Sequence, residues 1–209
     1  PLFSLAYVGV KGGMVIVSAD DPGPISSQTE QDTRRFADFC RIPVFDPSSP
    51  EEAYKMIGEA FEYSEKYNTP VLFRPTTRVC HAYASIDNCD SPSPKKYEGF
   101  VKDSKKWVIF PRLSFANHIM IEKRNVEIGK DFSTYSANKA EGGNSEKAVV
   151  TSGISYAYTK ECLKDYPDVK LIKIATAYPF PEDFVLSSLE GAKEVLCIEE
   201  LSPFIEEQI

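Results

Sequence analysis

The stretch Met14–Asp32, MVIVSADDPGPISSQTEQD, places a short apolar run directly before a dense group of polar side chains. Met14–Val17 is rich in β-branched residues, and such a run predicts a short strand buried on both faces. The apolar spacing within Glu30–Cys40 predicts a helix that follows. Ser18–Asp32 is therefore expected to be a loop at the carboxyl end of a strand.

The first 80 or so residues repeat this alternation of strand and helix. Phe3–Val10 is typical of the end of a helix stopped by glycine, and Pro43–Phe45 predicts a second strand. Ser49, a proline and two acids open a helix that we expect to end near Tyr67, and Val71–Arg74 predicts a third strand. Alternation of this kind predicts a parallel sheet, whose carboxyl edge is where ligands bind.

A second regular pattern begins at Lys147 and has the same character. Its predicted strands and helices occupy Ala148–Gly153, Ser155–Tyr166, Val169–Ile174, Pro181–Leu189 and Glu194–Glu200. Three strands with two crossovers make a small doubly wound domain.

The sequence thus predicts an α/β protein with two parallel-sheet domains joined by a linker. The expected bounds are 1–85 for the first domain, 86–145 for a mobile linker with limited structure, and 146–209 for the second domain. Within the linker, Trp107–Phe110 suggests a short strand and Leu113–Val126 suggests a helix.

The charge balance narrows the class of partner. With 24 basic and 31 acidic residues the net charge is −7, which argues against nucleic acid or an anionic membrane surface as the main partner. The basic stretch Lys95–Lys106 is interrupted by acids and is interpreted as a solvated connector. No apolar run reaches the ~18 residues of a membrane span. The start lacks Met and shows no signal peptide, so we expect a piece of a longer cytoplasmic protein.

The five cysteines are widely and irregularly spaced, at positions 40, 80, 89, 162 and 197, with no C-x-x-C pair. Zinc and iron–sulfur sites usually bring thiolates together through short local spacings, so no metal site is predicted. Reduced, mostly buried thiols are the simpler interpretation.

Candidate binding residues gather in the loop after the first strand: Asp20, Asp21, Ser26, Ser27, Gln28, Glu30 and Gln31. A simpler interpretation is available for part of this set. The prolines and glycine after Asp21 favour a turn, and Ser27 with Glu30 matches a capping box for the next helix. That interpretation accounts poorly for Asp20, Gln28 and Gln31.

Two further candidates, Arg78 and His81, follow the third strand at the same expected edge. A cation there could hold a carboxylate or phosphate, although a salt bridge at a domain interface is an equally good alternative. Ser152-Gly153 could present backbone N–H groups to an anion or could be a tight turn that requires glycine. The glycines at 9, 12 and 13 precede a strand, so they fail as a phosphate-binding loop.

Four motifs make the N-terminal part resemble the large (alpha) subunit of indolepyruvate:ferredoxin oxidoreductases. They are V-K-G-G-x-V-I-V-x-A-D-D-P-G at 10–23, S-S-Q-x-E-Q-D at 26–32, P-V-x-x-P at 43–47 and T-P-V-x-x-R-x-T-T-R-V-x-H at 69–81. The match covers about Pro1–Ala82. The part from Lys147 to Pro203 is similar to a transketolase C-terminal-like domain by pattern more than by motif.

The resemblance implies a thiamine-diphosphate enzyme that oxidatively decarboxylates aryl 2-oxo acids such as indolepyruvate, forms the acyl-CoA and reduces ferredoxin through iron–sulfur clusters. It implies that residues 1–85 are the C-terminal part of the pyrimidine-binding domain. The activating carboxylate would lie upstream of Pro1, and the pyrophosphate–Mg²⁺ motif and the cluster cysteines beyond Ile209. The family's Met-His is Pro24-Ile25 here, so any role of that histidine is lost.

We therefore expect a segment that is inactive alone and binds no cofactor tightly, whose partners are the remaining domains of the subunit and a beta subunit. The loop with Arg78 and His81 is expected to line the mouth of a thiamine–substrate cleft, because Ser27, Gln28 and Gln31 offer donors without a repelling charge. The alternatives are a non-catalytic binding or assembly module with the same folds, and a pyruvate- or 2-oxoglutarate-type enzyme.

Overall fold

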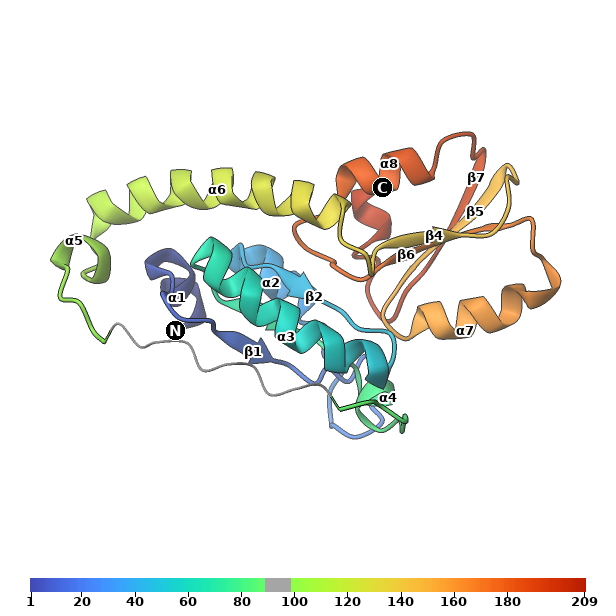
Figure 1. Cartoon of the computed structure of the whole chain (residues 1–209), viewed down its shortest axis with the longest axis horizontal. Coiled ribbons are helices and arrows are strands. Elements are labelled where there is room, and N and C mark those ends of the chain that lie inside the picture. The colour runs from blue at the N-terminus through green and yellow to red at the C-terminus, as the bar shows by residue number, and fades with distance from the viewer. Residues whose placement is uncertain (89–98) are drawn as a thin grey trace.

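The computed structural model describes residues 1–88 and 99–209, which form two sheets side by side (Figure 1). The first sheet contains β1 (Val15–Val17), β2 (Val44–Phe45) and β3 (Val71–Phe73) in the order β1-β3-β2. Both pairs are parallel, with Ile16 opposite Leu72 and Val44 opposite the same residue on the other side. The predicted parallel sheet is confirmed.

Four helices accompany this sheet: α1 (Leu2–Val8), α2 (Arg34–Cys40), α3 (Pro50–Tyr67) and α4 (Thr77–Cys80). The bounds of α3 follow from its ends, because the Ser49 hydroxyl accepts the Glu52 N–H at 3.2 Å and Asn68 closes the helix with a left-handed backbone. Gly9 ends α1 with φ 74°, and a Cβ there would lie 2.6 Å from the Asn68 carbonyl oxygen.

The second sheet has the order β4-β6-β5-β7. Its strands are β4 (Lys139–Glu141), β5 (Lys147–Ser152), β6 (Lys170–Ile174) and β7 (Glu194–Ile198). The last three are parallel, and β4 adds an antiparallel edge. The connecting helices are α7 (Ser155–Cys162) and α8 (Glu182–Ser188), with 3-10 turns at Leu163–Asp165 and Glu206–Gln208.

The two sheets share a hydrophobic core. One cluster joins Ile42, Val44 and Leu72 of the first sheet region to Val150 and Ile172 of the second. Backbone bonds also cross between the two parts, from Val44 N to the Tyr178 oxygen at 2.7 Å and from Asp46 N to the Ala175 oxygen at 2.8 Å. The two α/β units therefore pack directly against each other.

Two expectations about local structure need correction. β1 is not buried on both faces: Val17 is 61% exposed, because β1 is an edge strand that pairs only with β3 among the described strands. The helix expected from Glu30 begins at Arg34, so Ser27 and Glu30 do not cap it.

The expectation of limited structure across 86–145 is wrong for its second half. Helix α6 runs from Pro111 to Ser133 along the top of the molecule in Figure 1. It is held by Ile121, Ile128 and Phe132, which are buried against neighbouring elements.

Ser104–Trp107 forms the one-turn helix α5, where the Asp103 side chain accepts the Lys105 N–H at 2.9 Å, so the strand suggested at Trp107–Phe110 is absent. Part of the basic connector Lys95–Lys106, and Cys89, lie outside the described residues.

Among the described residues, none of the helices combines the length and hydropathy that crossing a membrane requires. Cys40, Cys80, Cys162 and Cys197 are free thiols, of which only Cys40 is buried.

Candidate functional site

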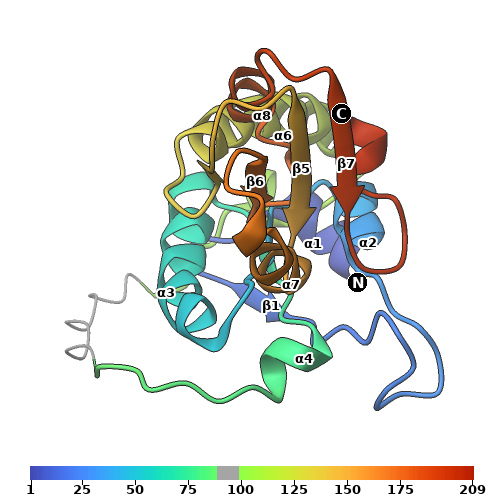
Figure 2. The same cartoon turned by 90° about the vertical axis from the view of Figure 1, so that its right-hand side faces the viewer.

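The loops that follow β1 and β3 lie together at the carboxyl edge of the first sheet. Asp20 and Thr76 form an isolated parallel bridge, and the Thr77 N–H donates to the Asp20 carbonyl oxygen at 2.9 Å. Figure 2 shows the loop between β1 and α2 and helix α4 at the same end of the molecule. The polar loop and the segment of Arg78 and His81 are therefore neighbours.

Asp21 holds the polar loop in shape. Its Oδ2 accepts the N–H groups of Ser26 and Ser27, both at 2.7 Å, of Ile25 at 3.1 Å, and the Ser27 hydroxyl at 2.9 Å. Its Oδ1 accepts the Thr77 hydroxyl at 2.8 Å. Burial raises the pKa of Asp21, but these donors outweigh it and hold the pKa well below its usual range. The carboxylate is therefore ionised, and its hydrogen bonds stabilise the loop.

Asp20 is fully buried and is likewise occupied by neighbouring donors. It accepts the Thr33 N–H at 2.7 Å and the Ser18 hydroxyl at 2.9 Å. Arg74 Nε, also buried, donates to its Oδ2 at 2.5 Å. Asp20 therefore joins the start of the loop to its end and to β3, rather than facing a ligand directly.

Arg74 is the centre of a buried charge cluster that the sequence analysis did not identify. Its Nη1 lies 3.3 Å from both carboxylate oxygens of Asp46, and its Nη2 lies 3.6 Å from Oδ1 of Asp32. Burial raises the pKa of Asp46, and the attraction of Arg74 only partly opposes this.

A second buried arginine, Arg34, extends the cluster to the other sheet. It makes two bonds to Asp32, at 2.8 and 2.6 Å, and its Nη1 donates to Glu199 at 2.7 Å. Its Nη2 also donates to the carbonyl oxygens of Glu200 and Ser202. Arg34 therefore ties the first turn of α2 to the segment that leaves β7.

The carboxyl ends of the two sheets meet at this cluster. Gly153 follows β5 with φ 51°, and a Cβ built on it would lie 3.1 Å from Oδ1 and 3.3 Å from Oδ2 of Asp46. This contact supports the tight-turn interpretation of Ser152-Gly153. The residues that approach one another all follow strands directly: Asp46 after β2, Arg74 after β3, Gly153 after β5 and Glu199 after β7. Asp46, Arg74 and Glu199 are charged residues directly after apolar runs, and this pattern could have identified them from the sequence.

The remaining sequence-based candidates lie outside this cluster. Ser26, Gln28, Glu30 and Gln31 are exposed on the loop, and Arg78 and His81 are exposed on and after α4. Ser27 is half-buried and turns its hydroxyl to Asp21 and to the Thr29 carbonyl oxygen, at 2.9 and 2.8 Å. The structure therefore divides the candidates into those that build the loop and those that face solvent from it.

The described residues do not fit a Mg²⁺–pyrophosphate group by themselves. The carboxylates at the carboxyl edge are engaged by arginines and by N–H and O–H donors, as the contacts of Asp20, Asp21 and Asp32 show. No group of three or more His, Cys, Asp or Glu in residues 1–88 and 99–209 is arranged to hold a metal ion. A catalytic step through such a group cannot be derived from this chain.

No family model matches the chain. Indolepyruvate oxidoreductase subunit IorA of Pyrococcus horikoshii is 37% identical over 214 residues, covering 99% of this chain and 33% of that protein. The subunit of the same name in Thermococcus kodakarensis is 39% identical over 210 residues, covering 97% of this chain and 32% of that protein. The chain thus spans about a third of the length of these relatives. The resemblance to the large subunit of these oxidoreductases is confirmed.

A solved structure shares the fold. It is a 2-oxoglutarate:ferredoxin oxidoreductase from Magnetococcus marinus with 2-oxoglutarate, coenzyme A and succinyl-CoA bound, with a TM-score of 0.64 at 17% identity. The similarity covers 99% of this chain and 46% of that chain. Together with the two observed sheets, it confirms the predicted α/β fold class.

Proposed function

We propose that this chain, which corresponds to about a third of an indolepyruvate oxidoreductase large subunit, is part of a thiamine-diphosphate-dependent 2-oxo acid:ferredoxin oxidoreductase. The observation that carries the proposal is sequence similarity along nearly the whole chain to relatives named indolepyruvate oxidoreductase subunit IorA. In the complete enzyme an aryl 2-oxo acid such as indolepyruvate loses CO₂, its acyl group joins the thiol of coenzyme A, and two electrons pass to ferredoxin.

The chain contributes the wall of the substrate cleft at the carboxyl edge of its first sheet. Gln28 and Gln31 are exposed there, and their neutral amides suit the orientation of a substrate carboxylate without adding a repelling charge. Arg78 stands on the neighbouring helix and supplies a positive charge at the same edge. Because Asp21 holds Ser26 and Ser27 by their N–H groups, the loop is presented in one defined shape.

Cofactors and partners belong to the complete enzyme in this proposal. Thiamine diphosphate supplies the carbanion-stabilising chemistry when bound, and iron–sulfur clusters carry the electrons. The remaining domains of the subunit and a beta subunit complete the cleft, and ferredoxin and coenzyme A are the diffusing partners. The segment alone is expected to be inactive and to bind thiamine diphosphate only weakly, as the engaged carboxylates also suggest.

The test uses the full-length subunit, purified without oxygen together with its partner subunit. Ferredoxin reduction is followed in the presence of coenzyme A, thiamine diphosphate and Mg²⁺, with indolepyruvate, phenylpyruvate, pyruvate and 2-oxoglutarate as parallel substrates. We expect the aryl substrates to give the highest kcat/KM. A preference for pyruvate or 2-oxoglutarate would contradict the substrate class, and no turnover with any of them would favour a binding or assembly module.

A further inference from the structure

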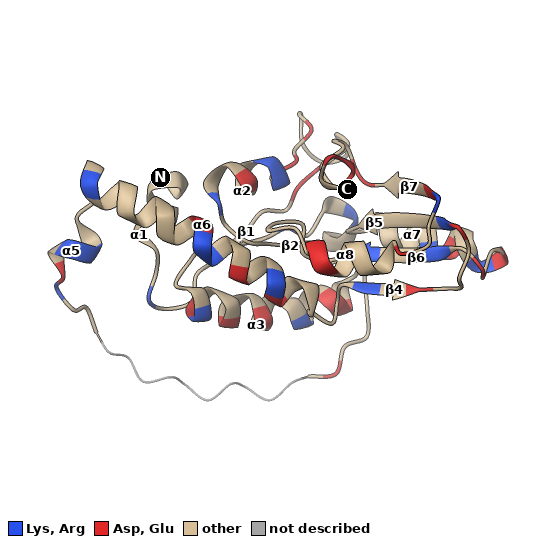
Figure 3. Ribbon diagram, turned by 90° about the horizontal axis from the view of Figure 1, so that it is seen from above, with Lys and Arg blue, Asp and Glu red and all other residues tan. Residues whose placement is uncertain are grey.

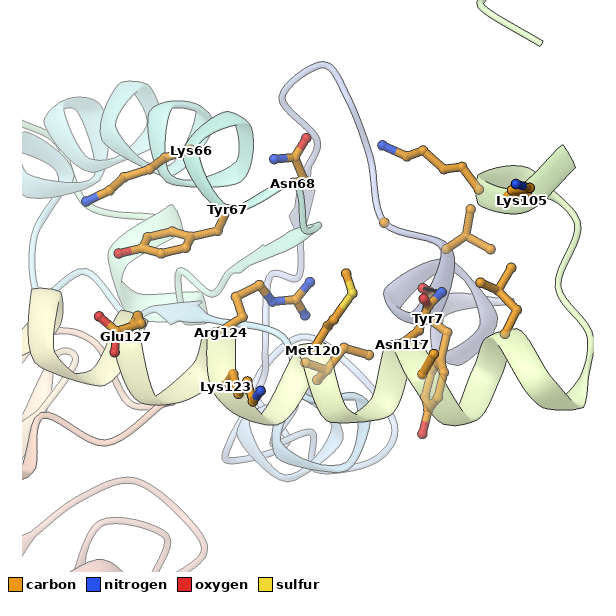
Figure 4. A pocket seen from close by; sticks show the side chains of 16 residues that line it. Tyr7, Lys66, Tyr67, Asn68, Lys105, Asn117, Met120, Lys123, Arg124 and Glu127 are labelled. Atoms are coloured by element: carbon orange, nitrogen blue, oxygen red, sulfur yellow. Dashed lines mark hydrogen bonds between the residues drawn. The ribbon is translucent and has the colours of Figure 1, made fainter. Parts of the chain in front are cut away.

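A cavity of about 850 Å³ lies between α1, the end of α3, α5 and α6 (Figure 4). Its wall includes Val8 and Gly9, which precede β1, and Tyr67 and Asn68, which precede β3. The cavity therefore lies at the amino edge of the first sheet, opposite the polar loop. Its volume is within the range of small-molecule sites.

Arg124 is a buried cation of this wall to which the described residues offer no hydrogen-bond acceptor. Arg124 extends from α6 into the cavity, as Figure 4 shows, and its Nε and Nη2 are buried without a hydrogen bond. No ion pair between Arg124 and a carboxylate is found in the described parts of the chain. Burial lowers the pKa of Arg124 to about 10, and the charge interaction with Tyr178 opposes this only in part. A bound anion would strongly stabilise the charged form of a buried arginine that lacks a carboxylate partner.

The other charges around Arg124 are mostly positive. Lys105 and Lys106 stand on α5, which carries blue ribbon in Figure 3, and Lys123 stands on α6. None of the three has an ion-pair partner among the described residues. The single acid of the wall, Glu127, is bound by Lys130 at 3.0 Å.

The fifth cation, Lys66, is already paired with Asp131. The cavity therefore has an unbalanced positive charge.

Apart from Asn68 and Asn117, the rest of the wall is mainly apolar or aromatic. Leu113, Ala116, Met120 and Ile121 line it from α6, and Val8 faces them from α1. Met120 is 65% exposed, which leaves its flexible side chain free to pack against a ligand. A ligand that fits this wall carries an apolar body as well as a negative group.

We propose that this cavity binds a small anionic molecule with an apolar body, an aryl or alkyl phosphate or carboxylate, whose negative group pairs with Arg124. The planar guanidinium matches both kinds of oxyanion, and Lys123 adds a second charge nearby. The site is independent of the proposed enzyme activity, since it shares no residue with the polar loop or with the buried charge cluster.

The test is a calorimetric titration of the full-length protein with 1-naphthyl phosphate and 1-naphthoate. Inorganic phosphate, which lacks the apolar body, and 1-naphthol, which lacks the charge, are the matched comparisons. We expect at least one of the two naphthyl anions to bind at least ten times more tightly than either comparison compound. Whichever of the two anions binds more tightly identifies the oxyanion that the site prefers.

Three variants locate the binding. Arg124→Met should weaken it about tenfold or more, and Met120→Glu, which places a carboxylate beside the arginine, should abolish it. Lys164→Met, at an exposed lysine in the turn after α7 that does not line the cavity, should leave it unchanged. Circular dichroism confirms that each variant is folded.

Two results would overturn the proposal. One is equal affinity of the wild-type and Arg124→Met proteins for the naphthyl anions, which would place their binding elsewhere. The other is no saturable binding to the wild-type protein at millimolar concentration, which is expected if another segment of the full-length subunit fills the cavity.

Discussion

Arg34 and Glu199 form a buried ion pair at 2.7 Å, with side chains only 1% and 7% exposed. The arginine begins α2 beside the first sheet, and the glutamate follows β7 of the second. The same glutamate accepts the N–H groups of Ile205 and Glu206, so it also holds the C-terminal turn. This pair joins the two units through charge rather than through apolar packing, as does the pair between Lys173 of β6 and Glu52 of α3.

Arg34→Met tests that junction. It leaves Glu199 buried without its cation and Asp32 with only the more distant Arg74, and breaking a buried pair in this way typically costs about 3–5 kcal/mol. Urea denaturation should show this loss as a lower midpoint. Arg35→Met is the matched control, because its pair with Glu207 is exposed and should contribute at most about 1 kcal/mol. Equal effects of the two substitutions would contradict the structural role of Arg34.

Asp21→Asn tests the organisation of the polar loop. The neutral amide loses the charge that holds three N–H groups, so hydrogen exchange at Ser26 and Ser27 should accelerate and stability at pH 7 should fall. The pKa of Asp21 is lower in the folded state than its ordinary 3.8, so its stabilising effect is complete above about pH 4 and is lost as the pH falls further.

The stability difference between wild type and Asp21→Asn should therefore shrink in acid, and denaturant titrations at pH 7, 4 and 2.5 measure it. Asp165→Asn, at an exposed aspartate of the second unit, is the control and should have almost no effect. A difference that stays constant with pH would show that Asp21 does not act through its charge.

Gly153→Ala tests the contact between β5 and Asp46. Any side chain at φ 51° is strained by about 1–2 kcal/mol, and here the new Cβ also presses on a buried carboxylate. Gly191→Ala separates the two effects, because Gly191 has φ 81° and an added Cβ there would meet no atom within 4 Å. We expect Gly153→Ala to be more destabilising than Gly191→Ala in thermal unfolding, by about 1 kcal/mol or more.

Gly58→Ala should stabilise the protein. Gly58 lies inside α3 with no atom within 4 Å of an added Cβ, so alanine gains helix propensity of about 0.5–1 kcal/mol without a clash. A raised denaturation midpoint is the expected result. A lowered midpoint would mean that this face of α3 contacts another part of the full-length protein.

The loop hypothesis is tested by kinetics in the full-length enzyme. Gln28→Ala and Gln31→Ala should lower kcat/KM for the 2-oxo acid about tenfold each, the value of one lost hydrogen bond to a charged group. Thr29→Ala, in the same exposed loop, should change it little. If all three variants match the wild type, the loop has no part in substrate binding.

Much of the fold was predictable because its signals are local. The cap at Ser49, the proline that follows it and the left-handed Asn68 act within a few residues, and they set both ends of α3 as predicted. The apolar runs that contain Val15–Val17 and Val71–Phe73 likewise predicted parallel strands. That topology also predicted that the segments after β1 and β3, where Asp20 and Thr76 lie, meet at one edge of the sheet.

The full length of α6 was not predicted, because its apolar positions face several elements. Phe115 and Met120 are 72% and 65% exposed, while Ile121 and Ile128 are buried. Such a mixed pattern gives only a weak helical stripe, so packing against α1 and α8 decides the length of the helix.

The amino-acid sequence by itself determined the order of strands and helices, the parallel first sheet and the position of the polar loop. The tertiary structure alone decided which charges meet: Arg74 and Asp20 are 54 positions apart, and Arg34 and Glu199 are 165 apart. The physical reason is the distance along the sequence over which each kind of interaction acts. Capping and backbone preferences act between near neighbours, whereas a buried ion pair forms only after two sheets have brought their strand ends together and excluded water between them.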